Sequence, residues 1–353
     1  MMPIPRTASQ WVYDQSTGLE LEEGVPIPDL KEGDCLLQIH AVSLNYGEVA
    51  RMKGKYPQEG PQRRVAGGDG VATVIATGSG VTEFQAGDRV CPIWQQTYQT
   101  GPLTPEIENT ALGLTIDGTL REYAVLAASG LVKAPTHLTH REAATLTCAA
   151  VTAWNGLCGL SERRLKAGDW VLTQGTGAVS LAAVQFAVAA GAHVVVTTST
   201  TEKAKFLKSL GVEHVLNYRE NPSWGESAKA LTPGGRGFHH IIELGGQRSL
   251  RESLQAVRCE GVVSLIGLME ELETIQNTPG ITFPELFLKY ATVRSLHVGS
   301  RQQFQEMVDF MEQHAIRPVV NEEEFKFEDC IQAYEKVWEG GHTGKIVVNV
   351  SSA

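Results

Sequence analysis

The chain has 353 residues, of which 20% are charged, and it carries a formal net charge of −10. This length exceeds what one ordinary hydrophobic core serves, so it predicts two domains with a cleft between them. Lysine and arginine are dispersed along the chain instead of forming a basic stripe, which argues against a nucleic-acid partner.

Six cysteines lie far apart, with neither a C-x-x-C pair nor a dense disulfide framework, as expected for reduced thiols. The first ten residues, MMPIPRTASQ, lack the apolar core of a signal peptide. No uninterrupted apolar run reaches the length of about 18 residues that a membrane span requires. We therefore expect a soluble cytoplasmic protein without a membrane partner.

The first part of the chain predicts an antiparallel, barrel-like all-β domain. Short β-type runs punctuated by glycine occupy residues 35–44, 70–81 and 86–90. Residues 92–118 show no clear period and predict a long loop, which in a compact domain often carries function.

From about residue 168, short apolar runs alternate with helical segments. This alternation predicts a parallel, doubly wound sheet with helices on both faces. The expected strands are 170–174, 193–198, 214–218, 239–244 and 261–268, and the expected helices are 178–190, 201–210, 223–231 and 248–258. Beyond them we expect a strand at 291–300, helices at 301–314 and 327–341, and a final strand at 345–350 that can return to the first domain.

Residues 171–186, VLTQGTGAVSLAAVQF, place a glycine turn between an expected strand and an expected helix. A dinucleotide site needs this order, because the turn lets a pyrophosphate approach the backbone and the helix amides face the anion. Gly175 and Gly177 stand where that geometry requires them, and the small residue Ser180 replaces a third glycine. An ordinary strand-to-helix turn is the alternative, but the position in the first βαβ unit favours a nucleotide site.

The end of the second strand of this unit bears on the choice between NAD and NADP. An acidic residue there would accept the ribose 2′-hydroxyl of NAD. The sequence instead has Thr197, Thr198, Ser199 and Thr200, with no carboxylate before Glu202, and Lys203 follows. A 2′-phosphate would therefore meet hydroxyls, a helix start and a cation, which favours NADP; a solvated lysine is the alternative.

Five segments together carry a family likeness: HAVSLNYGEVARMKGKYP, TEFQAGDRV, AGDWVLTQGTGAVSLAAVQFA, TSTTEKAKFLKSLGVEHVLNYRE and TGKIVVNV. In this order they resemble the medium-chain dehydrogenase/reductases, and specifically their zinc-independent, quinone-oxidoreductase-like branch. The resemblance implies an α/β protein in which a GroES-like β-barrel catalytic domain, residues 1–130 and 301–353, surrounds a Rossmann NADP-binding domain, residues 131–300. It also implies a homodimer in which ATVRSLHV, residues 291–298, extends the Rossmann sheet across the interface.

The zinc members of this family place a cysteine near residue 45 and Gly-His-Glu near residue 67. This chain has Asn45 in the first place and Gly67-Gly68-Asp69 in the second. Thiolate and imidazole ligands are both missing, and in the segment that matches a structural zinc lobe only Cys91 occurs. The expectation is therefore that no metal is bound.

The resemblance also implies site residues. Tyr56 matches the tyrosine assigned as proton donor in related enoyl reductases, and Asn45 matches a residue near the nicotinamide; a loop-capping tyrosine and a turn-forming asparagine are the structural alternatives. Thr152, which could also be a helix cap, and Leu268 are implied near the nicotinamide, Tyr218 near the 2′-phosphate and Lys345 near the pyrophosphate. The cofactor contacts expected in all are Gly175, Gly177, Ala178, Val179, Thr198, Ser199, Lys203, Tyr218, Thr152, Leu268 and Lys345.

A hydride acceptor gains negative charge, and without a metal that charge must be stabilised by hydrogen-bond donors. Conjugated acceptors spread the charge, so the expected activity is NADPH-dependent reduction of an α,β-unsaturated carbonyl compound or a quinone, bound in the cleft between the domains. The alternatives are a zinc-free alcohol or carbonyl oxidoreductase and a catalytically inactive NADPH-binding protein.

Overall fold

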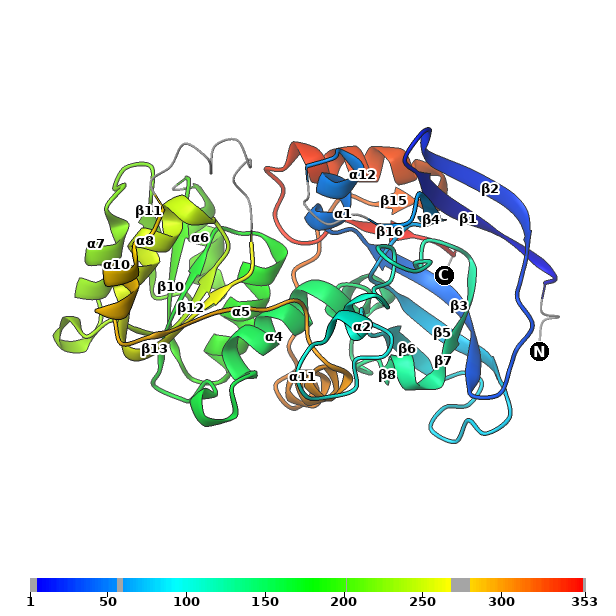
Figure 1. Ribbon diagram of the computed structural model, residues 1–353, viewed down its shortest axis with the longest axis horizontal. Coiled ribbons are helices and arrows are strands. Elements are labelled where there is room, and N and C mark those ends of the chain that lie inside the picture. Colours follow the sequence, from blue (N-terminus) through cyan, green and yellow to red (C-terminus); the bar gives the residue numbers. More distant parts are fainter. Residues whose placement is uncertain (1–4, 56–59, 201, 268–279, 352–353) are drawn as a thin grey trace. The chain divides into compact units, whose positions relative to one another are not determined.

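The computed structural model describes residues 5–55, 60–200, 202–267 and 280–351, and the chain divides into two compact units (Figure 1). Unit 1 contains Met1–Val151 and Val298–Ala353, and unit 2 contains Thr152–His297. The chain thus passes between units at 151 and 297, where the sequence suggested 130 and 300. Among the described residues, no helix combines the length and apolar character needed to span a membrane.

Unit 1 is built around two β-sheets. The larger has the strand order β15-β16-β3-β5-β6-β8, and β7 also pairs with β3. The smaller has the order β2-β1-β4. The strands are β1 (Thr7–Asp14), β2 (Gly18–Pro26), β3 (Asp34–Ser43), β4 (Arg63–Val65), β5 (Val71–Thr77), β6 (Arg89–Pro92), β7 (Tyr123–Ala127), β8 (Leu131–Lys133), β15 (Phe325–Lys326) and β16 (Val347–Asn349).

The last strand of the chain lies beside one of the first. β16 pairs antiparallel with β3, with Val348 opposite Val42, and both side chains are buried in the core of unit 1. The helices of unit 1 are α1 (Tyr46–Met52), α2 (Pro105–Glu108), α3 (His140–Ala143), α11 (Arg301–Gln313) and α12 (Cys330–Glu339). Pairing of β16 with β3 brings residue 345 to the end of β3, which positions one of the clusters described below.

Two features of unit 1 differ from the sequence expectation. β1 and β2 were not predicted, because most of β2 is exposed and carries glutamates instead of an apolar face. The segment 92–118 is mostly irregular as expected, but it contains α2 and contributes the buried side chains of Ile93, Leu112 and Leu114 to the interior. This loop is therefore also part of the packing of the unit.

Unit 2 is a six-stranded, wholly parallel sheet of order β11-β10-β9-β12-β13-β14, flanked by helices (Figure 1). Its strands are β9 (Trp170–Gln174), β10 (His193–Thr198), β11 (His214–Asn217), β12 (Phe238–Glu243), β13 (Val257–Leu265) and β14 (Thr292–Ser295). Its helices are α4 (Val151–Cys158), α5 (Ala178–Ala189), α6 (Glu202–Ser209), α7 (Trp224–Ala230), α8 (Gln247–Ala256) and α10 (Phe283–Phe287).

The doubly wound prediction is confirmed, with three corrections at element ends. The strand expected over 261–268 is β13, which runs over Val257–Leu265. The helix expected over 248–258 ends at Ala256, because Val257 is already extended and pairs with Phe238 of β12. The strand expected over 291–300 is limited to Thr292–Ser295. The strand order changes direction between β9 and β12, which is the point where α/β sheets bind ligands at the carboxyl ends of their strands.

Candidate functional site

The glycine turn joins β9 to α5 at the carboxyl edge of the sheet. Gly175 has φ of 73°, a left-handed conformation that suits glycine, and its amide donates to the Thr197 carbonyl at 2.6 Å. Gly177 is the N-cap of the 12-residue helix α5. A Cβ placed on either glycine would have no neighbour within 4 Å. The turn therefore leaves open space beside the first amides of α5, and a pyrophosphate fits such a cradle.

Ser180 does more than replace a small glycine. Its hydroxyl accepts from the Thr173 hydroxyl at 2.8 Å and donates to the Gly175 carbonyl at 2.8 Å, and its side chain is fully buried. The serine thus links the end of β9, the turn and the first turn of α5. The sequence did not predict this link, because the glycine motif indicates where a small residue is needed and says nothing about hydrogen bonds of a serine in that place.

A second buried network holds the same edge and was missed by the sequence reasoning. The Glu243 carboxylate, 1% exposed at the end of β12, accepts from Gln174 Nε2 at 2.6 Å and from the amides of Gly245 and Gly246 at 2.9 and 3.2 Å. The hydroxyls of Ser249 and Ser253 also donate to it. Since Gln174 immediately precedes Gly175, this network anchors the turn to the neighbouring strand.

The residues expected near the ribose lie at the ends of β10 and β11. Thr198 is buried at the end of β10, and its carbonyl accepts from the Tyr218 amide at 3.0 Å. Tyr218 has 40% of its surface exposed, and Lys203 is half-buried in the first turn of α6. Because parallel strands present their carboxyl ends at one edge, Thr198 and Tyr218 share that edge with the glycine turn.

The remaining predicted site residues, the cofactor contacts and the proposed proton donor Tyr56, are distributed as follows. Ala178 and Val179 open α5 and are half-buried, and Ser199 is half-buried after β10. Thr152 is 4% exposed and is the second residue of α4, which continues directly from a π-helical turn at Leu146–Ala150, so it does not cap a helix start. Leu268 and Tyr56 lie outside the described residues.

Unit 1 contains a buried polar cluster made by Asn45, Glu48, Asp69, Tyr334 and Lys345. Lys345 Nζ donates to Asp69 Oδ2 at 2.9 Å, to the Leu44 carbonyl at 2.9 Å and to Asn45 Oδ1 at 2.6 Å. The lysine is 5% exposed and the aspartate is fully buried. All three hydrogens of this ammonium group therefore have acceptors within unit 1, in place of the pyrophosphate that the resemblance suggested.

Glu48 forms the other side of this cluster. Its Oε1 accepts from Asn45 Nδ2 at 2.9 Å and from the Gly68 amide at 3.1 Å, and its Oε2 accepts from the Tyr334 hydroxyl at 2.9 Å. Burial raises the pKa of Glu48, and the nearby Asp69 acts in the same direction, whereas the bond from Asn45 and the charge of Lys345 oppose the shift. Burial beside Glu48 likewise raises the pKa of Tyr334 well above its usual value.

The position of each partner in the fold explains the cluster. Asn45 is the N-cap of α1, Glu48 lies in the first turn of that helix, and Tyr334 is a buried residue of α12. Lys345 precedes β16, whose pairing with β3 brings it to the Leu44 carbonyl. Asn45 and Lys345 are 300 residues apart in sequence, so their contact could not have been read from any local motif.

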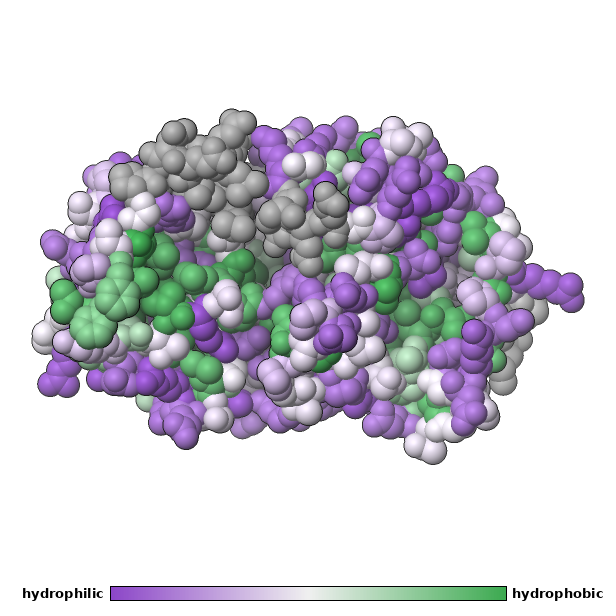
Figure 2. Space-filling model, in the orientation of Figure 1, coloured by the Kyte–Doolittle hydropathy of each residue, from purple (hydrophilic) through white to green (hydrophobic). Residues whose placement is uncertain are grey.

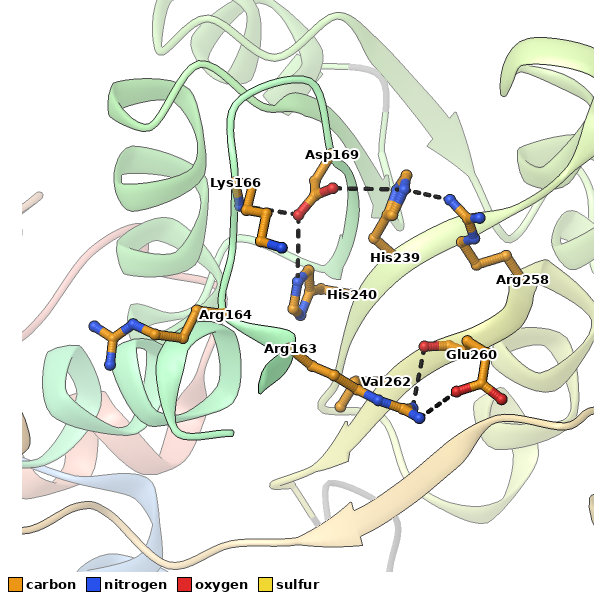
Figure 3. Close-up of a pocket in the computed structure, with 9 residues that line it drawn as sticks. All are labelled: Arg163, Arg164, Lys166, Asp169, His239, His240, Arg258, Glu260 and Val262. Carbon is orange, nitrogen blue, oxygen red and sulfur yellow. Dashed lines mark hydrogen bonds and ion pairs between the residues drawn. The ribbon is translucent and has the colours of Figure 1, made fainter. Parts of the chain in front are cut away.

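A separate pocket of about 210 Å³ lies near the amino-terminal ends of the strands of the unit 2 sheet (Figure 3). Four of its nine lining residues are arginine or lysine, but acidic partners are present: Asp169 lies 3.5 Å from His239 Nε2 and 3.7 Å from His240 Nε2, and Arg163 pairs with Glu260. Its residues come from the start of β12, from Arg258 to Val262 in β13 and from residues 163–169 before β9. It is therefore distinct from the glycine turn, which lies at the carboxyl edge.

Two family models match the chain. Residues 31–136 match the alcohol dehydrogenase GroES-like domain, and residues 178–313 match the zinc-binding dehydrogenase family. A zinc-type alcohol dehydrogenase-like protein of Schizosaccharomyces pombe is 40% identical, with 96% of this chain and 98% of that protein covered.

Solved structures of alcohol dehydrogenases are also similar to this chain. A putative alcohol dehydrogenase of Sinorhizobium meliloti 1021 is 34% identical with a TM-score of 0.87, covering 99% of this chain and 100% of that one. An NAD-dependent alcohol dehydrogenase is 26% identical with a TM-score of 0.83, covering 97% and 100%. The chain belongs to the medium-chain dehydrogenase/reductase superfamily, as an oxidoreductase of the alcohol dehydrogenase-like type.

Proposed function

We propose that this protein is an NADPH-dependent, metal-free reductase that transfers hydride to an activated C=C bond or a quinone. The observation that carries the proposal is the buried Lys345–Asp69 pair, whose ammonium group lies beside Asn45 where zinc-containing relatives have a metal ligand. A small-molecule acceptor follows from the oxidoreductase class of the chain.

Three features of unit 1 support the absence of zinc at these positions. Asn45 and Gly68 supply neither thiolate nor imidazole, the ligands that zinc prefers. Asp69 Oδ2 is occupied by Lys345 and by the Ser43 hydroxyl. A Cβ added at Gly68 would overlap Nε1 of Trp94 and lie 3.0 Å from the Leu112 carbonyl oxygen, so a histidine has no room there.

The proposal that the protein binds no zinc is tested by measuring the number of zinc ions per chain. The protein purified in the presence of excess Zn²⁺ and then dialysed is expected to retain well below one zinc per chain. The proposal would be contradicted if the wild-type protein retained one zinc per chain and the Asp69→Asn variant did not.

The residues at the carboxyl edge of unit 2 fit a nicotinamide dinucleotide. The amides following Gly175 and Gly177 would hold the pyrophosphate, with Ala178 and Val179 in the first turn of α5, and the open space beside both glycines supports this. Bound NADPH supplies the hydride. The NAD-dependent relative makes NADH the competing cofactor.

A preference for the phosphorylated cofactor follows from the end of β10. Thr198 and Ser199 offer hydroxyls, and no acidic side chain precedes Glu202 to repel a 2′-phosphate. Lys203 is placed in the first turn of α6 and Tyr218 at the end of β11, so both are proposed contacts of that phosphate. Glu202 shares the first turn of α6 but is itself exposed.

The choice of acceptor follows from the charge that hydride transfer creates. An enone or quinone delocalises it, whereas a saturated ketone leaves a localised alkoxide that needs a stronger electrophile. Asn45 donates a hydrogen bond to the acceptor oxygen, and Tyr56 delivers the proton. Tyr56→Phe is expected to lower turnover with little change in NADPH affinity, and unchanged turnover would remove that role.

The assay follows NADPH absorbance at about 340 nm with matched acceptors. We expect oxidation of NADPH by an enone or a quinone and none by the corresponding saturated ketone. The reverse pattern would support a zinc-free alcohol or carbonyl oxidoreductase, the function that the alcohol dehydrogenase names of the relatives favour. Cofactor binding without turnover across the panel would indicate a catalytically inactive NADPH-binding protein.

We further propose that the protein is a homodimer formed through unit 2. Within the described part of the chain, β14 pairs with β13 alone and so presents an unpaired strand edge. Hydrophobic side chains gather around the neighbouring helix α10 (Figure 2). The exposed ones are Phe283, Phe287, Leu288 and Tyr290, each more than half exposed. An exposed apolar patch beside a free strand edge is typical of an interface.

A further inference from the structure

The ammonium group of Lys345 has an unusual environment for a lysine. It is 5% exposed, and its three hydrogens are donated to Asp69, to the Leu44 carbonyl and to Asn45. A buried cation is costly unless it is paired and fully hydrogen-bonded, and here it is both. The fold therefore holds this ammonium group at one fixed place through its three contacts.

This charge determines which way the Asn45 amide faces. A lysine ammonium can only donate, so the atom 2.6 Å from it must be the amide oxygen, Oδ1. The nitrogen Nδ2 then faces Glu48 Oε1 at 2.9 Å, and the carboxylate accepts one of its two hydrogens. Within the part of the chain that the structure describes, the second Nδ2 hydrogen has no acceptor.

The same contact strengthens that remaining hydrogen as a donor. A positive charge on the amide oxygen withdraws electron density through the conjugated amide, and hydrogen bonds in series polarise one another. Asn45 is half-buried at the start of α1, which limits competition from water. Lys345, Asn45 and an acceptor oxygen would thus form a chain of two hydrogen bonds that begins at a buried cation.

We infer that Lys345 is a positioning residue that orients and polarises the Asn45 amide so that Nδ2 stabilises the negative charge developing on the reduced substrate. This inference rests on the proposed metal-free reduction and gives it a source of positive charge. Lys345 acts through Asn45 and does not itself touch the substrate. Asp69 holds the ammonium group of Lys345 in place, and Glu48 accepts a hydrogen bond from the Nδ2 group of Asn45.

The test removes the charge without leaving a buried one behind. Lys345→Met alone would leave Asp69 buried and unpaired and threatens folding, so the main variant is the double substitution Lys345→Met/Asp69→Asn, which neutralises both partners. The matched control is Lys336→Met, which removes a lysine of unit 1 paired with Glu323 at 3.1 Å in a more exposed setting. The full-length proteins are compared with NADPH bound.

Turnover provides the first readout. In the double variant kcat is expected to fall roughly tenfold while the KM for NADPH changes less than about twofold, because the lost interaction strengthens only as charge develops. Lys336→Met should match the wild type. In an Asn45→Ala background the same double substitution should cause no further loss, since Lys345 acts through Asn45. Independent, multiplicative losses, or an unchanged kcat in the double variant, would overturn the inference.

The second readout does not depend on turnover. In protein labelled with ¹⁵N at asparagine, the Asn45 side-chain amide signal is identified by its loss in Asn45→Ala. That signal is expected to shift in Lys345→Met/Asp69→Asn and to stay in place in Lys336→Met. An unmoved signal would overturn the inference even if the enzyme is active. A shifted signal in a protein that reduces no acceptor would retain the amide orientation and refute the proposed function instead.

Discussion

Replacing Ser180 by glycine restores the third glycine of the dinucleotide fingerprint, yet the structure predicts that this change is harmful. The Ser180 hydroxyl takes part in two buried hydrogen bonds, one from Thr173 and one to the Gly175 carbonyl. Each bond contributes about 0.5–1.5 kcal/mol, with a larger cost where a buried group is left unpaired. Glycine within α5 adds about 0.5–1 kcal/mol relative to alanine.

We therefore expect Ser180→Gly to lower the free energy of unfolding by about 2–4 kcal/mol, and Ser180→Ala by about 1–3 kcal/mol. The assay is equilibrium urea unfolding followed by circular dichroism, with the melting temperature measured alongside. NADPH affinity should also fall, because the bond to Gly175 holds the turn that faces the pyrophosphate.

The control for this prediction is Ser209→Ala, which removes a hydroxyl that donates to the Phe206 carbonyl at 2.7 Å at an exposed position of α6. It should change stability by no more than about 0.5 kcal/mol. The reasoning would be refuted if Ser180→Gly were as stable as the wild type and bound NADPH equally well, since the glycine would then supply everything that the serine does.

Three further predictions concern other parts of the molecule. Lys203→Ala should weaken NADPH about tenfold and leave NADH unchanged, with Lys208→Ala on the same helix as control; equal losses for both cofactors would remove the 2′-phosphate contact. Burial raises the pKa of Glu48 above its ordinary 4.5, so between pH 4.5 and the raised pKa the folded protein keeps a proton that the unfolded chain has lost, and the free energy of unfolding falls as pH rises through this window. Glu48→Gln should make the melting temperature fall less steeply over the same pH range. An unchanged slope would refute this prediction. Phe287→Glu should convert the dimer to a monomer in light scattering, whereas the exposed Ile331→Glu in unit 1 should not; a monomeric wild type would contradict the proposed interface.

The sequence pattern anticipated unit 2 well, because its elements are specified locally. Alternating apolar runs and helical segments located β9, β10 and α5 to within a residue or so, since a strand buried on both faces must be continuously apolar. The end of α8 was misplaced at 258, because pairing of Val257 with Phe238 decides between helix and strand there. Such pairing depends on a partner distant in sequence.

Unit 1 was less predictable for the same reason. β1 and β2 lack an apolar alternation strong enough to stand out, and they are ordered by pairing with each other and with β4. The cluster around Lys345 unites the residues after β3 with the chain terminus, so the lysine could be placed only by family likeness. No spacing rule links positions 300 residues apart.

By itself the sequence determined the α/β class, the glycine turn after the first strand of the parallel sheet and the absence of a carboxylate after the second strand. Each of these features depends on residues that are close together in the sequence. Tertiary structure alone decided that Ser180 ties the turn together and that Trp94 fills the space beside Gly68. It also decided that Lys345 forms an ion pair with Asp69 and donates a hydrogen bond to Asn45. These are properties of packing and hydrogen-bond geometry, which arise only when segments far apart in the chain come into contact.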